Sequence, residues 1–245
     1  MTSLKPEYSL CFPVYKDERT VAKVAQKALD FFGEVGLPFE VLIVDDGSPD
    51  KAGEIADSLA KTNPQVRVVH HAKNLGYGAA IKTLINNARG DWICLIDGDD
   101  EYDIYDFEKL LKHQSHYDLI ITFRYMKLYS GKRQFISWVY NAIFRMLFRT
   151  NYRDISTGLR MISKSLALDL HLDSNSPFIG AEITVKSMLK GYRIGEVGIQ
   201  TFPREFGKGN SVSLKNITAT IRDMLKMHGK IFSESYELPR NRERK

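Results

Sequence analysis

Two carboxylates one residue apart, Asp97 and Asp99, follow the apolar run formed by residues 92–96. Such a run suits a buried strand, and the active sites of open α/β sheets form where strands of this kind end. Residues i and i+2 of an extended chain point the same way, so both carboxylates can face one hard cation. A divalent cation held there can bridge the phosphates of a nucleotide. The alternative is a solvated acidic turn that continues through Asp100 and Glu101.

A second apolar run, residues 39–44, also ends in paired acids, Asp45 and Asp46. A carboxylate at the end of a strand can accept the N–H of a base or the hydroxyls of a ribose. Ser48 or Asp50 is suited to cap a helix over about residues 51–60. An ordinary strand–cap–helix junction explains Asp50, but it does not explain acid pairs after two strands. The two pairs together favour a nucleotide site.

Composition and length fit one enzyme domain. The chain has 245 residues, of which 43% are hydrophobic, so it can bury a sizeable core. Cys11 and Cys94 lie in apolar runs, which predicts two buried thiols in a reducing compartment. Residues 1–6 lack the apolar core of a signal peptide. No apolar run approaches the roughly 18 residues of a membrane-spanning helix. These features predict a cytoplasmic protein without a transmembrane helix.

Apolar periodicity alternates between strand and helix along the first half of the chain. The predicted strands cover residues 9–14, 39–44, 66–70, 92–96 and 118–123, and the predicted helices cover about 18–35, 51–60 and 78–88. This order predicts an α/β fold with a mostly parallel sheet flanked by helices. We expect a single domain over residues 1–234, with a nucleotide-binding half at 8–123 and an acceptor- and membrane-facing half at 124–234. Residues 235–245 form a basic tail that we expect to be flexible.

Several other functions fit the sequence poorly. The first strand-to-helix turn, residues 11–18, contains no glycine, whereas a dinucleotide fold needs GxGxxG there. Gly76 and Gly78 follow the third strand, where they serve either phosphate binding or close helix packing. The net charge of +5 is modest, and no nucleic-acid-binding pattern accompanies it. No histidine pairs with an obvious serine or cysteine nucleophile, so hydrolase chemistry is unsupported.

Several motifs, taken in order, resemble those of family 2 glycosyltransferases of GT-A fold. They are Pro13-Val14-Tyr15, Val44-Asp45-Asp46-Gly47-Ser48-Pro49-Asp50, Asn74-x-Gly76-x-Gly78-Ala79-Ala80 and Asp97-Gly98-Asp99. Residues 154–160 and 191–197 look like segments typical of the dolichol- or polyprenyl-phosphate sugar synthase branch. The resemblance covers roughly residues 8–213, and the ordered set is far more specific than any single motif.

The resemblance implies a donor site. Its nucleotide-binding residues would be Pro13, Tyr15, Asp17, Asp45, Asp46, Gly76, Gly78, Asp97 and Gly98. Asp45 would meet the base and Asp46 would lie near the ribose, while Asp97 and Asp99 would hold the donor pyrophosphate through Mg²⁺ or Mn²⁺. Glu101 stands where the family often has glutamine, which makes it a third candidate ligand. Asp17 departs from the family's usual glutamate.

The resemblance also implies an acceptor site. Arg124, Ser156, Arg204 and Lys208 would bind the acceptor phosphate, and Asp97, Asp99, Arg124 and Arg204 would form the catalytic set. The segment at residues 204–211 is longer than the family's compact form, so Lys208 is a weaker candidate than Arg204. Glu182 and Asp154 stand where a relative might keep a base, but Glu182 fits poorly and suits a structural ion pair equally well.

Residues 124–153 contain seven lysines or arginines and no acid. Over residues 135–149, a broad apolar face alternates with a narrow polar stripe at Ser137, Asn141, Arg145 and Arg149. Such a basic amphipathic helix lies either in the plane of an anionic membrane or on the sheet with a solvated basic edge. A second amphipathic helix, over residues 212–232, suits core packing, dimerisation or membrane docking.

Together these observations predict an inverting, metal-dependent glycosyltransferase. It would move a sugar from GDP-mannose or a UDP-sugar to a polyprenyl or dolichyl phosphate at the cytoplasmic face of a membrane, to which it binds peripherally. One alternative is a family 2 enzyme that acts on a sugar hydroxyl of a glycan or glycolipid. Another is a non-catalytic nucleotide-sugar-binding protein, which a donor-hydrolysis assay would distinguish. We expect no nucleic-acid partner. The sequence leaves open a membrane subunit, a homo-oligomer, and the identity of base, sugar and lipid.

Overall fold

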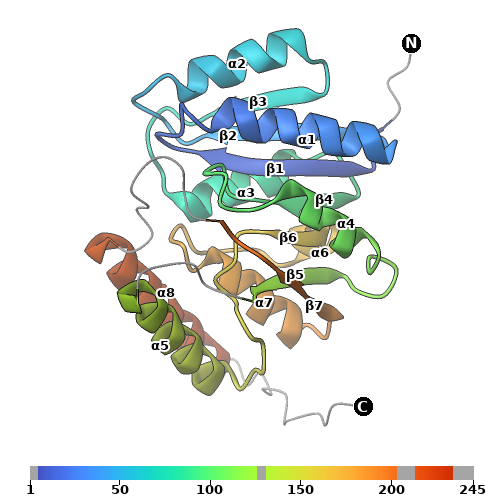
Figure 1. The fold of residues 1–245 in the computed structure, drawn as a ribbon. Helices are drawn as coiled ribbons and strands as arrows, with labels where there is room; N and C mark the ends of the chain where they lie inside the picture. Colours follow the sequence, from blue (N-terminus) through green and yellow to red (C-terminus); the bar gives the residue numbers. More distant parts are fainter. Residues whose placement is uncertain (1–4, 126–130, 203–212, 234–245) are drawn as a thin grey trace.

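A computed structural model describes residues 5–125, 131–202 and 213–233 of the chain (Figure 1). The first half alternates strands and helices: β1 Tyr8–Val14, α1 Val21–Val35, β2 Phe39–Asp45, α2 Ala52–Thr62, β3 Val66–His70, α3 Tyr77–Asn87 and β4 Trp92–Leu95. A 3-10 turn (Ile104–Asp106) and the short helix α4 (Phe107–Leu111) lead to β5, Leu119–Arg124. The strands predicted for this half all form, with ends that shift by one residue or less.

The second half contains more helix than strand. Its elements are α5 Gly131–Phe148, β6 Arg160–Ser163, α6 Lys164–Asp169, α7 Ile179–Leu189, β7 Ile194–Ile199 and α8 Leu214–Ser233. The two amphipathic helices predicted for this half correspond to α5 and α8. Helix α5 begins four residues before the predicted start at residue 135. No helix within the described stretches has the length and apolar content to cross a bilayer.

One seven-stranded sheet organises the molecule, with strand order β3-β2-β1-β4-β6-β5-β7. All neighbouring strands are parallel except β6, which runs antiparallel to both β4 and β5. The prediction of a mostly parallel sheet flanked by helices is therefore confirmed. Because β1 pairs in parallel with β2 and β4, the loops that follow these three strands leave the same edge of the sheet. Both predicted acid pairs are at this edge, with Asp45 as the last residue of β2 and the other three acids in the loops.

The two faces of the sheet carry separate cores, because successive strand residues point to opposite sides. On β1, Leu10 and Phe12 pack under α1 and α2, whereas Cys11 packs under α3, α6 and α7. Both cysteines are buried free thiols. Burial raises the pKa of each thiol, so neither is reactive at neutral pH.

A third apolar cluster joins α5 and α8, which lie side by side at the lower left of Figure 1. Phe144 and Phe148 of α5 are buried there against Met224 and Met227 of α8. The helix therefore uses part of its apolar face for packing. Asn141 was predicted to lie on the polar stripe of this helix. It is instead buried, and its side-chain oxygen accepts the backbone N–H of Ile155.

Candidate active site

A large cavity of about 1660 Å³ opens at the carboxyl edge of the sheet. Loops that follow β1, β3 and β4 form one side, the segment between α6 and α7 forms another, and α8 borders it. Nine of the predicted site residues line it: Pro13, Tyr15, Asp17, Asp46, Gly76, Asp97, Gly98, Asp99 and Ser156. The structure thus brings together loops that are as many as 143 residues apart in sequence.

The loop after β4 approaches the end of β1 through Gly98. A Cβ at this position would lie 2.6 Å from the carbonyl oxygen of Pro13, so only glycine fits without a backbone shift. The hydroxyl of Thr20, just before α1, donates to the carbonyl of Gly98 at 2.7 Å. Gly98 therefore fixes the distance between the acid pair and the first loop.

Asp100 anchors the same loop from the other side. Its backbone has φ +60°, which costs energy for a residue with a side chain. Lys23 and Lys27 of α1 both pair with its carboxylate, at 2.7 and 2.6 Å. These contacts hold the strained turn, so Asp100 is a support for the acid pair rather than a member of it.

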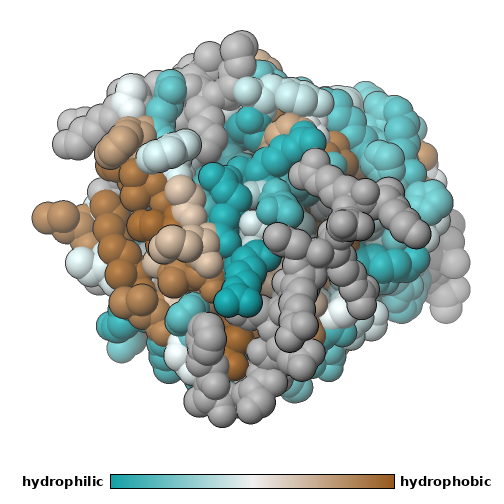
Figure 2. Space-filling view, turned by 90° about the horizontal axis from the view of Figure 1, so that it is seen from below, coloured by the Kyte–Doolittle hydropathy of each residue, from teal (hydrophilic) through white to brown (hydrophobic). Residues whose placement is uncertain are grey.

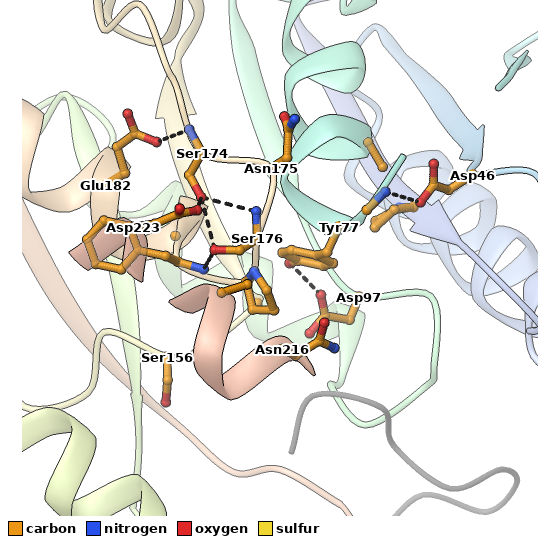
Figure 3. Close-up of a pocket in the computed structure, with 18 of the residues that line it drawn as sticks. Asp46, Tyr77, Asp97, Ser156, Ser174, Asn175, Ser176, Glu182, Asn216 and Asp223 are labelled. Atoms are coloured by element: carbon orange, nitrogen blue, oxygen red, sulfur yellow. Dashed lines mark hydrogen bonds between the residues drawn. The ribbon is translucent and has the colours of Figure 1, made fainter. Parts of the chain in front are cut away.

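Asp97 and Asp99 both line the cavity. The hydroxyl of Tyr77 donates to Oδ1 of Asp97 at 2.7 Å (Figure 3). The backbone N–H of Glu101 donates to Oδ1 of Asp99 at 3.1 Å. Carboxylate oxygens are the donors that Mg²⁺ and Mn²⁺ prefer, and Mg²⁺ usually takes one or two of them together with substrate phosphates. The pair therefore fits a divalent cation shared with a diphosphate.

Glu101 has a different placement from the acid pair. It is buried and does not belong to the cavity wall. Across the described residues, no three histidine, cysteine or acidic side chains gather as a metal cage would require. Of the three carboxylates predicted as metal ligands, Asp97 and Asp99 therefore line the cavity and Glu101 does not.

Asp46 fixes the loop that precedes α3. Its carboxylate accepts the backbone N–H groups of Leu75 and Gly76, both at 2.9 Å, and bonds Nδ1 of His71 at 2.6 Å. It also lines the cavity, as predicted. Asp46 thus shapes the cavity wall by holding the loop after β3.

Asp45, in contrast, does not reach the cavity wall. Its carboxylate accepts the backbone N–H of Ser48 at 2.9 Å and bonds Nδ1 of His70 at 3.0 Å. Burial tends to raise the pKa of Asp45, but its hydrogen bonds with Ser48 and His70 outweigh burial and lower it. The structure places Asp45 as a support of the strand end and not on the cavity wall, so its contact with a base stays a prediction.

The two glycines before and within α3 have distinct roles. Gly76 adopts φ +100°, which favours glycine, and its N–H binds Asp46. At Gly78, a Cβ would lie 2.6 Å from the carbonyl oxygen of Ser174, and the N–H donates to the carbonyl of Asn175 at 3.0 Å. Of the two roles left open by the sequence, close packing explains Gly78.

A hydrogen-bond network around Asp154 lies behind the part of the cavity wall that contains Ser156. Arg124 donates to its carboxylate at 2.8 Å and to the hydroxyl of Ser156 at 2.7 Å. The Ser156 hydroxyl is 2.7 Å from Oδ1 of Asp154. Ser156 lines the cavity, whereas Arg124 does not, and its side chain is only 7% exposed. Arg124 therefore stands behind Ser156 and orients it.

Glu182 holds the segment between α6 and α7. Its two oxygens accept the backbone N–H groups of Asp173 and Ser174, at 2.8 and 2.9 Å, and Figure 3 shows the bond with Ser174. Lys186 pairs with it at 2.8 Å. The structural alternative for Glu182 is therefore what the geometry supports, with a lysine as partner. Arg204 and Lys208 lie outside the described residues.

Comparisons with known proteins identify the family to which these motifs belong. Residues 9–169 match the model of glycosyl transferase family 2. This chain belongs to that family. It is 28% identical to glycosyltransferase AglD of Haloferax volcanii over 97% of this chain, and 26% identical to an undecaprenyl-phosphate 4-deoxy-4-formamido-L-arabinose transferase of Pectobacterium carotovorum over 85%. The chain spans 38% and 64% of the length of these two relatives.

Solved structures share the fold. Glucosyl-3-phosphoglycerate synthase of Mycobacterium tuberculosis superimposes with a TM-score of 0.73 and 16% identity in its complex with phosphoglyceric acid, over 92% of this chain and 80% of that one. Its complex with Mn²⁺, UDP-glucose and phosphoglyceric acid gives a TM-score of 0.68 at 15% identity and the same coverage. The GT-A fold predicted for this family 2 glycosyltransferase is confirmed.

Tyr77 and Arg160 of this family 2 chain are among the cavity-lining residues that were not predicted as site residues. Tyr77 lies between the two glycines of the third motif, and burial together with the charge of Asp97 raises the pKa of its hydroxyl. Arg160 ends the segment at residues 154–160, and burial lowers the pKa of its guanidinium, which donates to the carbonyl of Gly180 at 2.6 Å. Both residues lie within motifs that resemble those of the family, and this position in the sequence was the signal that could have identified them as site residues.

Proposed function

We propose that this family 2 glycosyltransferase moves a sugar, with inversion, from a nucleotide-sugar donor (GDP-mannose or a UDP-sugar) to a polyprenyl or dolichyl phosphate at the cytoplasmic face of a membrane. One observation carries the proposal. A single cavity extends from the carboxylates Asp97 and Asp99 to α8, a helix with exposed apolar side chains. A charged donor and a lipid-borne acceptor can therefore meet in one site.

The donor end of the cavity suits a nucleoside diphosphate. Asp97 and Asp99 supply hard oxygen ligands at the end of β4, and Tyr15 and Asp46 lie on the wall beside them. A Mg²⁺ or Mn²⁺ ion bound there would stabilise the charge of the leaving diphosphate. The Mn²⁺ and UDP-glucose complex of the mycobacterial neighbour supports this choice of donor and cation.

The acceptor end suits a phosphate rather than a hydroxyl. A phosphate monoester has a second pKa of about 6, so at neutral pH it needs positioning more than a base. The two candidate bases are both held by other groups: Glu182 binds two backbone N–H groups and Lys186, and Asp154 pairs with Arg124. The name of the Pectobacterium relative, an undecaprenyl-phosphate transferase, supports the same acceptor class.

The proposed reaction is a single displacement at the anomeric carbon. An oxygen of the acceptor phosphate attacks this carbon, and the bond from the carbon to the donor pyrophosphate breaks on the opposite face. The leaving nucleoside diphosphate takes the electron pair of that bond, so no proton has to move. Ser156, oriented by Arg124, and Arg204 would position the acceptor phosphate through charge-assisted or neutral hydrogen bonds.

Apolar side chains on the outer surface support the membrane part of the proposal. Figure 2 shows hydrophobic residues gathered on one side of the face seen from below, the side where α5 and α8 lie in Figure 1. The exposed large apolar residues of these helices are Phe135, Trp138, Ile143, Met146, Leu214, Ile221 and Leu225. Together with the basic residues Arg145 and Arg149, they would give a surface suited to the interface of an anionic bilayer.

A direct assay tests the proposal. The protein is incubated with GDP-mannose, UDP-glucose and UDP-N-acetylglucosamine in turn, with Mn²⁺ or Mg²⁺ and a short polyprenyl phosphate, and lipid products are extracted. Transfer to the lipid phosphate with inverted configuration is the expected result. Transfer only to free saccharides would favour the hydroxyl-acceptor alternative. Donor binding without hydrolysis or transfer to any acceptor would favour a non-catalytic binding protein.

A further inference from the structure

Tyr77 connects the helix after β3 to the acid pair after β4. It is the first residue of α3, and its hydroxyl donates to Oδ1 of Asp97 at 2.7 Å (Figure 3). Both residues line the cavity. This contact orients Asp97 only if both Tyr77 and Asp97 are themselves held in place by other parts of the structure.

The backbone at Tyr77 is held on both sides. Before it, Asp46 accepts the N–H groups of Leu75 and Gly76. After it, Gly78 packs against the segment at residues 174–175, where its N–H donates to the carbonyl of Asn175. The backbone that carries Tyr77 is therefore held in place. Its hydroxyl reaches the Asp97 carboxylate while that carboxylate stays on the cavity wall.

The carboxylate of Asp97 is confined from another direction by Gly158. A Cβ at Gly158 would overlap both oxygens of this carboxylate, so the absence of a side chain there is required by the observed position of Asp97. Gly158 is itself fixed, because its N–H donates to the hydroxyl of Tyr102 at 2.8 Å. Tyr77 and Gly158 together define where the Asp97 carboxylate lies.

We propose that Tyr77 is a positioning residue that orients the Asp97 carboxylate toward the divalent cation of the donor complex. This inference rests on the proposed role of Asp97 as a cation ligand. Mg²⁺ requires near-ideal octahedral geometry, so a carboxylate that rotates away loses affinity. Groups that orient metal ligands by hydrogen bonds typically affect metal affinity by about 10- to 100-fold.

The test compares Tyr77→Phe with a matched control, Tyr192→Phe. The hydroxyl of Tyr192 also donates to an aspartate, Oδ2 of Asp169 at 3.0 Å, but neither residue lines the cavity. Mn²⁺ binding to the full chain is measured by calorimetry with saturating UDP, beside thermal unfolding of each variant. We expect Tyr77→Phe to weaken Mn²⁺ binding by about 10-fold or more. Tyr192→Phe should bind Mn²⁺ like the wild type.

A second variant keeps the inference testable if Tyr77→Phe folds poorly. Gly158→Ala leaves the tyrosine in place and displaces the Asp97 carboxylate, so it should weaken Mn²⁺ binding in the same way. Unchanged Mn²⁺ affinity in folded Tyr77→Phe would overturn the positioning role alone. A wild-type protein that binds UDP-sugar but no divalent cation would overturn the metal part of the proposed function as well, so the two failures are distinguishable.

Discussion

The two halves of the molecule hold their parts of the cavity by different means. In the first half, polar contacts connect one loop to the next: Thr20 binds the carbonyl of Gly98, Asp46 binds the loop before α3, and the N–H of Glu18 binds Asp50 at 3.1 Å. In the second half, α5 and α8 are joined by a cluster of aromatic, aliphatic and methionine side chains. Hydrogen bonds between loops hold the end of the cavity that we propose for the donor, whereas apolar packing against α5 holds α8 at the other end, in addition to the hydrogen bonds of Glu182.

This difference matches the ligands that we propose for each end. A nucleoside diphosphate with its cation demands fixed oxygen positions, which hydrogen-bonded loops can supply. A lipid tail has no such geometry, and methionine-rich packing accommodates irregular shapes. The two ends are connected where α8 meets the segment between α6 and α7, because Ser174 donates to Asp223 of α8 at 2.7 Å.

The largest expected effect is the loss of one negative charge from the acid pair, Asp97 and Asp99, at the proposed donor end. We expect Asp99→Asn to lower transfer by about 100-fold or more, and Asp97→Asn by less, because removing a cation ligand weakens ion and diphosphate binding together. Rates are measured at saturating donor over a Mn²⁺ titration, with circular dichroism to confirm folding. Full activity of Asp99→Asn in the presence of a chelator would exclude the metal role.

A second pair of variants separates the two acceptor chemistries. Arg204→Ala should lower transfer by about 10- to 100-fold, since a hydrogen bond to a charged phosphate contributes about 1.5–3 kcal/mol. Glu182→Gln should leave the rate of folded protein nearly unchanged, because Glu182 holds backbone N–H groups and Lys186. Both rates are normalised to the folded fraction. The reverse pattern, with Glu182→Gln inactive and Arg204→Ala active, would assign a hydroxyl acceptor.

The third prediction tests whether the exposed apolar side chains of the second half meet a bilayer. Trp138 and Met146 are 61% and 72% exposed, whereas Phe144 is fully buried, so glutamate at residue 144 would disrupt the fold. We expect Trp138→Glu with Met146→Glu to lower binding to anionic vesicles by at least about 10-fold, given roughly 1.5–3 kcal/mol for each large apolar side chain removed from water. Vesicle flotation measures the bound fraction.

A salt titration and a control variant make the vesicle-binding test more specific. Wild-type binding should weaken with added salt, since the basic residues act within a Debye length of about 8 Å at physiological ionic strength. Val35→Glu changes an exposed apolar residue at the end of α1, away from α5 and α8 in Figure 1, and should bind vesicles normally. Flotation that neither the double variant nor salt alters would assign the α5 surface to another interface.

The sequence predicted the first half better than the second for a physical reason. Buried parallel strands read as continuous apolar runs, and each run here ends at a polar residue that marks its carboxyl end. Strand β6 has four residues and follows a motif, so its antiparallel pairing with β4 carries little local signal. Helix α5 distributes its apolar residues between packing and exposure, and periodicity alone does not divide them.

Site residues were predictable where a motif marks a loop, and less so where the fold decides which side chain faces the cavity. Asp45 and Asp46 are neighbours in sequence, yet only Asp46 lines the cavity, because successive residues at the strand end point in opposite directions. Glu101 and Asp99 differ for another reason, because the turn at Asp100 interrupts the alternation that would place both side chains on one side. The role proposed for Tyr77 could be recognised only from its contact with Asp97 in the structure.

The smallest expected effect concerns His70, which forms a hydrogen bond with the supporting acid Asp45. The carboxylates of Asp45 and Asp57 both lie 3.0 Å from His70, one at each ring nitrogen, and these hydrogen bonds raise its pKa above 6.5. A histidine with a raised folded pKa stabilises the protein fully below its unfolded pKa, and this contribution is lost as pH rises through the folded pKa. We therefore expect the free energy of unfolding to fall as pH increases above about 6.5.

In His70→Gln, this pH dependence should be reduced, because glutamine stays neutral across the range. The change should be below about 1 kcal/mol, since the histidine side chain is 42% exposed and the pair is screened by solvent. Urea unfolding of both proteins at several pH values from 6 to 8.5 measures it, with donor binding as a parallel readout. Because Asp45 lies off the cavity wall, donor affinity should not follow the loss of stability. A matching drop in donor affinity would instead place Asp45 in the donor site and weaken the distinction between the supporting and the ligand-facing acid of this pair.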